Sequence, residues 1–137
     1  MKNKLLFTLS LIVLLSCCSE GKSKRRKVQS RKLYGWWIID SIYIKNEDIK
    51  SCYLTNMVKI DKEKIALPSL NPVCLDYLGP FIVNPKWALN ESMDTIYLNG
   101  GDWSGSYMYR TFNDHVNNPY RIQISGNDKY ITMLRIW

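Results

Sequence analysis

The chain has 137 residues and a formal net charge of +7, because 19 Lys and Arg outnumber 12 Asp and Glu. The basic excess lies entirely in the first 32 residues, since ten basic and eleven acidic residues follow from Leu33 onward. A nucleic-acid-binding domain carries its own basic face, so this balance argues against nucleic acid as a partner of the segment 33–137.

Residues 1–16 have the pattern of an exported leader. Lys2 and Lys4 precede an uncharged run from Leu5 to Leu15, which is typical of a secretory signal peptide. The run is too short for a membrane-spanning helix, which needs about 20 residues.

The end of this run, Leu14-Leu15-Ser16-Cys17, resembles the lipobox of bacterial lipoproteins that signal peptidase II processes. The resemblance implies that Cys17 carries lipid on its sulfur and that the leader is cut before it. It also implies a lipid-anchored protein of the cell envelope, at the outer membrane of a Gram-negative bacterium. Lipid attachment at Cys18 and an uncleaved anchor are the alternatives.

Residues 17–32 are expected to form a lipidated, disordered basic tail. Val28 is the one large apolar residue in the segment 19–32, and such a segment cannot build a core. The tail is either a solvated spacer or a basic strip that lies on anionic lipid. In the second case each basic residue contributes up to about 1 kcal/mol to membrane binding. Positive charge directly after an apolar run also opposes export, and we give the lipobox more weight. The basic residues are Lys22, Lys24, Arg25, Arg26, Lys27, Arg31 and Lys32.

The segment 33–137 is expected to be a single β domain. In its clearest strand, Gly35–Ile44, one face is expected to carry Trp36, Ile38, Ile42 and Ile44, and the other Trp37, Ile39 and Tyr43. Four prolines between residues 68 and 85 predict loops and short edge pieces there. The other predicted strands are Met57–Ile60, Lys64–Leu67, Thr95–Asn99, Ser106–Phe112, Tyr120–Ser125 and Tyr130–Trp137.

Short strands at even spacing, joined by Gly, Asn and Asp turns, favour an all-β fold with an antiparallel sheet that closes on itself. The sequence shows no amphipathic helix after residue 33. A small antiparallel β-barrel is therefore the predicted fold, with a two-sheet sandwich or a half-open sheet as alternatives.

The opening Leu33-Tyr34-Gly35-Trp36-Trp37 is similar to that of lipocalin-like domains, which begin with Gly-x-Trp on the first strand. Gly35 and Trp37 match the two fixed places. The resemblance implies an eight-stranded barrel whose Trp closes one end beneath an Arg of the last strand. Arg135 is the first candidate for that Arg and Arg121 the second. Small lipoproteins of Bacteroidetes combine a lipobox, a short tail and such a domain.

Cys52 and Cys74 are 22 positions apart. Outside the cytoplasm they are able to form a disulfide, which would stabilise the fold by about 3 kcal/mol. Two buried thiols that pack as small apolar groups are the alternative.

Groups that carry catalysis are scarce. His115 is the single histidine, which excludes a zinc site with several histidines. No nucleophile elbow or phosphate-binding glycine loop is present. We therefore expect no enzyme, no metal and no cofactor.

The sequence leaves two functions open. The first is an envelope lipoprotein that binds a small apolar ligand inside the barrel, with Trp37 and Arg135 as candidate contacts. The second is a protein-interaction module, such as an immunity or inhibitor lipoprotein. That function predicts an exposed aromatic patch at Trp87 or at Trp103–Tyr109.

Overall fold

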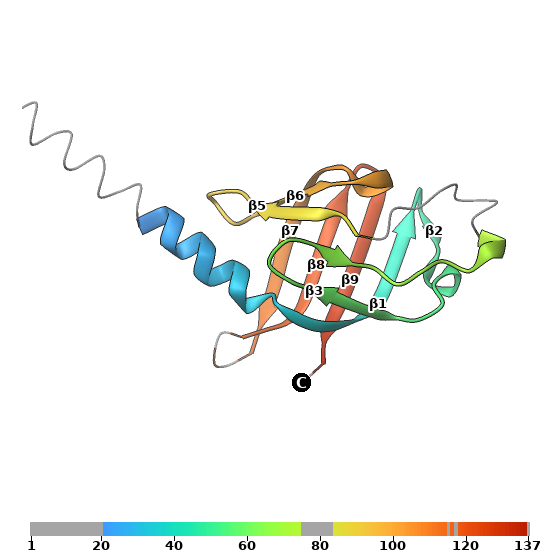
Figure 1. The fold of residues 1–137 in the computed structure, drawn as a ribbon, viewed down its shortest axis with the longest axis horizontal. Coiled ribbons are helices and arrows are strands. Elements are labelled where there is room, and N and C mark those ends of the chain that lie inside the picture. Colours follow the sequence, from blue (N-terminus) through green and yellow to red (C-terminus); the bar gives the residue numbers. More distant parts are fainter. Residues whose placement is uncertain (1–20, 75–83, 115, 117, 137) are drawn as a thin grey trace, which may run out of the picture.

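A computed structural model describes residues 21–74, 84–114, 116 and 118–136 of the chain (Figure 1). The predicted leader, Cys17, Cys18 and His115 lie outside the described residues.

Besides the helix over residues 21–32, the described residues form nine strands and two short 3-10 helices. In β3 and β6, for example, burial alternates from one residue to the next, because successive side chains point to opposite faces of a sheet. The strands are β1 (Gly35–Ile44), β2 (Glu47–Asp48), β3 (Met57–Ile60), β4 (Ile65–Ala66), β5 (Lys86–Leu89), β6 (Thr95–Asn99), β7 (Gly105–Asn113), β8 (Pro119–Gly126) and β9 (Lys129–Arg135), and the 3-10 helices are η1 (Lys50–Cys52) and η2 (Gly101–Trp103).

The sheet follows the order β4-β3-β1-β9-β8-β7-β6-β5, and β2 pairs with β1 off this path. The two ends of the path approach each other, because Ile65 N donates to Pro85 O at 3.0 Å and Trp87 N donates to Glu63 O at 3.3 Å. Apart from β2, strands adjacent in the chain are therefore adjacent around a nearly closed, up-and-down barrel. The predicted small antiparallel β-barrel is confirmed.

A β-bulge in β1 changes which residues face the interior. The pairing of β1 with β9 shifts register between Ile39 and Ser41. Ile39 is buried before the bulge and Ile42 after it, whereas Trp36 and Ile38 are exposed. The prediction that Ile42 shares a face with Trp36 and Ile38 is therefore wrong, because the extra residue of a bulge interrupts the alternation.

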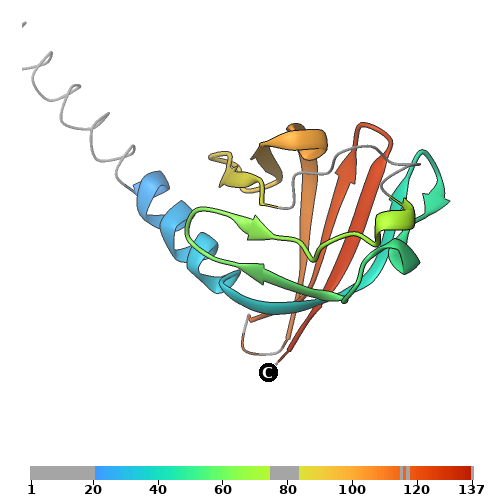
Figure 2. The ribbon, with the colours of Figure 1, turned by 45° about the vertical axis from the view of Figure 1, so that its right-hand side comes forward.

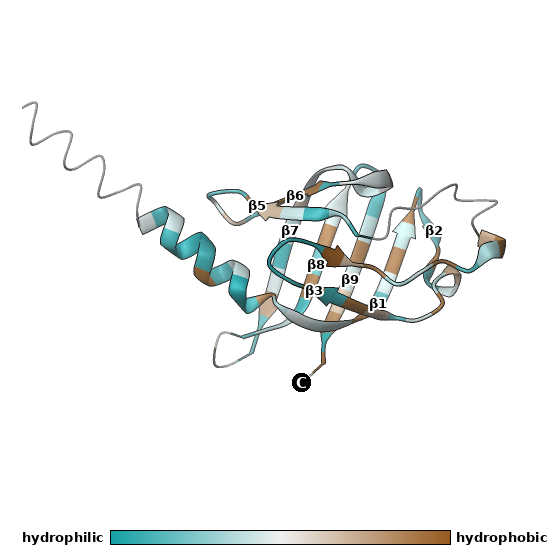
Figure 3. Cartoon of the chain, viewed as in Figure 1, coloured by the Kyte–Doolittle hydropathy of each residue, from teal (hydrophilic) through white to brown (hydrophobic). Residues whose placement is uncertain are grey.

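Residues 21–32 form a helix, where the sequence analysis expected disorder. Figures 1 and 2 show this helix leaving the barrel at the start of β1, and Figure 3 shows that it is mostly hydrophilic. Lys, Arg and Gln are good helix formers, and the barrel holds the last turn by contacts described below. In the described part of the chain, no helix has the length and apolar character needed to cross a membrane.

Candidate functional sites: the barrel end, the outer face and the basic groove

Trp37 closes one end of the barrel beneath Arg135. The indole is fully buried, and its Nε1 donates to the carbonyl of Leu33 at 2.8 Å. The Arg135 guanidinium carbon lies 5.4 Å from the centroid of the Trp37 ring. Arg135 also donates to two backbone carbonyls, those of Lys32 at 2.6 Å and Tyr34 at 3.1 Å. One side chain of the last strand thus fastens both the last helical turn and the start of β1.

Gly35 makes this arrangement sterically accessible. Its φ is +136°, a conformation that residues with a Cβ rarely adopt. A Cβ built there would lie 3.7 Å from Arg135 Nη2. The glycine therefore lets the chain turn from the helix into β1 directly beneath the guanidinium, which gives a physical reason for the spacing of Gly35 and Trp37.

Arg121, the second candidate for the partner of Trp37, lies elsewhere. Its Nη2 is 3.3 Å from Asp40 Oδ2, and its guanidinium carbon is 5.7 Å from the Phe112 ring centroid. Asp40 also accepts a hydrogen bond from the Thr132 hydroxyl at 3.1 Å. Arg121 therefore belongs to a partly exposed polar pair on the barrel wall.

Among the described residues, large side chains pack closely inside the barrel. The apolar cavity described there has a volume of about 10 Å³, roughly the space of one water molecule. Neither Trp37 nor Arg135 lines this cavity, so it does not provide the ligand pocket that the sequence analysis expected. Its walls are Ile65, Leu67, Pro85, Leu98, Trp103, Ile124, Ile131 and Met133.

The aromatic residues at Trp103–Tyr109 do not form an exposed patch. Trp103, Tyr107 and Tyr109 are 1%, 1% and 4% exposed, and burial raises the pKa of the Tyr107 and Tyr109 phenols. Trp87 is half-buried, and its Nε1 donates to Asp61 O at 2.9 Å. The prediction of a patch at Trp103–Tyr109 is wrong, because distant strands decide which face of β7 points inward.

An apolar row lies instead on the outer face of strands β3, β1, β9 and β7. Ile38 pairs with Met57 on one side and with Leu134 on the other. Leu134 is opposite Arg121, which in turn is opposite Phe112. With Trp36, which is about half exposed, these residues form what we call the outer apolar row: Trp36, Ile38, Met57, Phe112 and Leu134.

The sequence contains a signal for this row. Trp36 and Ile38 alternate with Trp37 and Ile39, so one pair had to face outward once the other faced the core. The alternation assigns the faces, but it does not decide which of them is buried.

A second surface feature is a groove of about 580 Å³ between the helix 21–32 and the β5 side of the barrel. Four of its lining residues are cationic, with Arg26, Lys27 and Arg31 on the helix and Lys62 in the turn between β3 and β4. We call it the basic groove. The other lining residues are Ser30, Tyr34, Trp87, Ala88 and Leu89.

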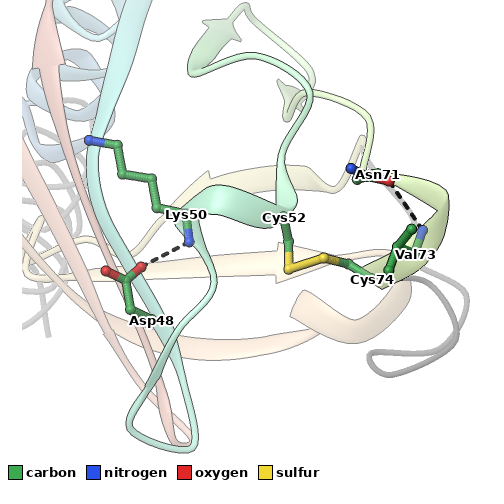
Figure 4. The surroundings of a disulfide bond; sticks show 6 residues. All are labelled: Asp48, Lys50, Cys52, Asn71, Val73 and Cys74. Atoms are coloured by element: carbon green, nitrogen blue, oxygen red, sulfur yellow. Dashed lines mark hydrogen bonds between the residues drawn. A yellow bond between two sulfur atoms is a disulfide. The ribbon is translucent and has the colours of Figure 1, made fainter.

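Cys52 and Cys74 form a disulfide, with their Cα atoms 5.7 Å apart (Figure 4). Beside it, Asn71 N donates to Cys52 O at 2.7 Å, and the Asn71 side chain accepts a hydrogen bond from Val73 N at 3.1 Å. The bond thus joins the end of η1 to the segment that follows β4, on the side of the barrel away from the helix (Figure 1).

Comparison with protein-family models, with characterised proteins and with solved structures gives no match. Within the described ranges, no three His, Cys, Asp or Glu side chains gather where they would hold a metal ion.

Proposed function

We propose that this protein is an envelope lipoprotein, anchored through Cys17, whose filled barrel acts as a protein-interaction module. The observation that carries the proposal is the contrast between the inside and the outside of the barrel. Pockets for small ligands have volumes of about 300–1,000 Å³, whereas the described interior cavity has about 10 Å³. On the outside, by contrast, large apolar side chains remain in contact with water.

The composition of the outer apolar row supports a protein partner. Trp36 is 49% exposed and Ile38 is 40% exposed, and aromatic residues dominate the binding energy of many protein interfaces. Polar groups border the row, since Lys59 Nζ lies 5.5 Å from the Trp36 ring centroid and Arg121 is paired with Asp40. An apolar centre with a polar rim is the usual anatomy of such an interface.

Site-specific photo-crosslinking tests the interaction. The full chain is expressed in its native cells with a photoreactive residue in place of Ile38. Irradiation is expected to give a covalent adduct of discrete mass between the chain and a protein partner. The matched control is Tyr97 on β6, which is similarly exposed but lies outside the row. Leu134→Glu should remove the Ile38 adduct, because it places a charge in the apolar contact. Identical adducts from Ile38 and Tyr97, or an adduct that survives Leu134→Glu, would contradict the proposal.

The anchor has a separate test. Two or three acyl chains on Cys17 hold a protein firmly at a membrane, since each buried CH₂ contributes about 0.8 kcal/mol. Cys17→Ala is therefore expected to leave the leader uncut, to remove the mass of the lipid and to lower the membrane-bound fraction. Cys18→Ala is the matched control, because it removes the neighbouring thiol and should change none of these properties. If the lipid is lost in Cys18→Ala but kept in Cys17→Ala, the attachment site is Cys18.

A further inference from the structure

We propose that the basic groove binds the phosphate headgroup of an anionic membrane phospholipid. The inference rests on the proposed anchor for the source of its ligand, and on the groove itself for the chemistry of binding.

Cations stand on both walls of the groove. Arg26, Lys27 and Arg31 are exposed on the helix, and Lys27 and Arg31 are neighbours one turn apart. Lys62 is exposed on the opposite wall. A phosphate between the walls would meet guanidinium and ammonium groups from two directions, and both groups form strong charge-assisted hydrogen bonds with phosphate.

The acidic residues next to Lys62 in the chain do not line the groove. Asp61 Oδ1 accepts hydrogen bonds from the backbone N–H groups of Glu63 and Lys64, each at 2.9 Å. These bonds hold the turn that presents Lys62, and they lower the pKa of the Asp61 carboxyl. Glu63 is exposed beside the turn, and the lining itself keeps a net positive charge.

Two aromatic side chains, Tyr34 and Trp87, also line the groove and are held in place. The rings of Tyr34 and Trp87 meet edge to face, with centroids 6.3 Å apart and an interplanar angle of 83°. The hydrogen bond from Trp87 Nε1 to Asp61 O holds the indole. Trp and Tyr favour the interface between headgroups and acyl chains, where one part of the ring is apolar and the other is wet.

This combination favours a lipid headgroup over a free anion. Inorganic phosphate satisfies the cations but leaves the aromatic surface exposed to water, whereas a phospholipid covers both. Arg26 lies nine positions after Cys17 in the sequence, so the proposed anchor keeps the groove within reach of the bilayer surface. Each basic residue near an anionic surface strengthens binding by about fivefold.

The test measures lipid binding to the full chain in a nonionic detergent, by native mass spectrometry and by tryptophan fluorescence. The probes are phosphatidylglycerol, which is anionic, phosphatidylcholine, which is zwitterionic, and inorganic phosphate. The variant Arg31→Gln/Lys62→Gln removes one cation from each wall. The control Lys24→Gln/Arg110→Gln removes the same charge from exposed residues that do not line the groove.

The full chain is expected to bind phosphatidylglycerol at least about tenfold more tightly than the other two probes. The groove variant should bind it roughly thirtyfold more weakly, from two lost cations, and the control variant should bind as the wild type does. Equal binding of the two lipids, or equal weakening in both variants, would overturn the proposal. Phosphate binding as tight as that of phosphatidylglycerol would overturn the choice of a lipid.

Both variants change exposed side chains, and a near-ultraviolet circular dichroism spectrum like that of the wild type shows that each is folded. If the groove variant is not folded, Lys62→Gln alone gives the same comparison, with an expected weakening of about fivefold. Lipid binding in detergent does not depend on the proposed anchor. The anchor is therefore tested separately, by the mass and the membrane-bound fraction of Cys17→Ala.

Discussion

Arg135→Met tests whether one side chain joins the helix to the barrel. The substitution keeps the aliphatic stem and removes the guanidinium, which donates to Lys32 O and Tyr34 O and lies over Trp37. A hydrogen bond that involves a charged group contributes about 1.5–3 kcal/mol, and a cation over an indole about 0.5–2 kcal/mol. Because Arg135 is only partly buried, the lower ends of these ranges apply, and for two hydrogen bonds and one ring contact the expected loss of unfolding free energy is about 3.5 kcal/mol.

Urea denaturation followed by tryptophan fluorescence measures this loss, and hydrogen exchange of residues 21–32 measures the release of the helix. The control is Arg121→Met, which breaks the Asp40 pair on the barrel wall. Ion pairs at such partly exposed positions contribute at most about 1 kcal/mol, and this variant should leave exchange in the helix unchanged. The reasoning is refuted if Arg135→Met costs less than about 1 kcal/mol, or if both variants lose stability equally.

Three further predictions concern stability. Gly35→Ala should lower the unfolding free energy by about 1–3 kcal/mol, because its φ of +136° strains any residue with a Cβ; an unchanged urea midpoint would contradict this. Replacing Cys52 and Cys74 with Ala should cost about 3 kcal/mol, and reductant should destabilise the wild type equally but leave the variant unaffected. Burial raises the pKa of the Tyr53 phenol. The contribution of the phenol to the unfolding free energy is therefore fully present below about pH 10 and is lost as the pH rises further. Between about pH 8 and pH 11, the unfolding free energy of Tyr53→Phe should therefore fall less than that of the wild type. In the control Tyr97→Phe, which changes an exposed tyrosine, the fall should equal that of the wild type.

Local patterns were sufficient to predict most of the barrel. The predicted strands Met57–Ile60 and Thr95–Asn99 coincide with β3 and β6, and those near β7, β8 and β9 differ from them by one or two residues at each end. In these strands, alternation and flanking turn residues carry the signal. β5 was missed, because Lys86–Leu89 is short and contains no β-branched residue.

Features that depend on long-range contacts were not predictable in the same way. The bulge after Ile39 is a property of the pairing between β1 and β9. The helix 21–32 is held partly by Arg135, which donates to Lys32 O across a sequence separation of 103 residues. Whether the interior is filled depends on how large side chains such as Trp103 fit together, and periodicity carries no information on volume.

The Gly-x-Trp resemblance located one end of the barrel but not a binding site. It named Arg135 as first candidate for the residue above Trp37, and the guanidinium does lie over that ring. Both residues serve the packing of the barrel end. The outer apolar row was not singled out from sequence, because it combines residues from several strands. For the basic groove, the sequence offered the basic residues of the tail as a strip on anionic lipid, but not their juxtaposition with Lys62 and Trp87.

The pairing of β1 with β9 has a consequence for how the protein matures. Along that edge, β1 has no partner strand until β9 has been made, so the barrel cannot close before the chain reaches Arg135. If the chain crosses a membrane amino end first, as proposed above, its barrel would stay open until β9 has also crossed.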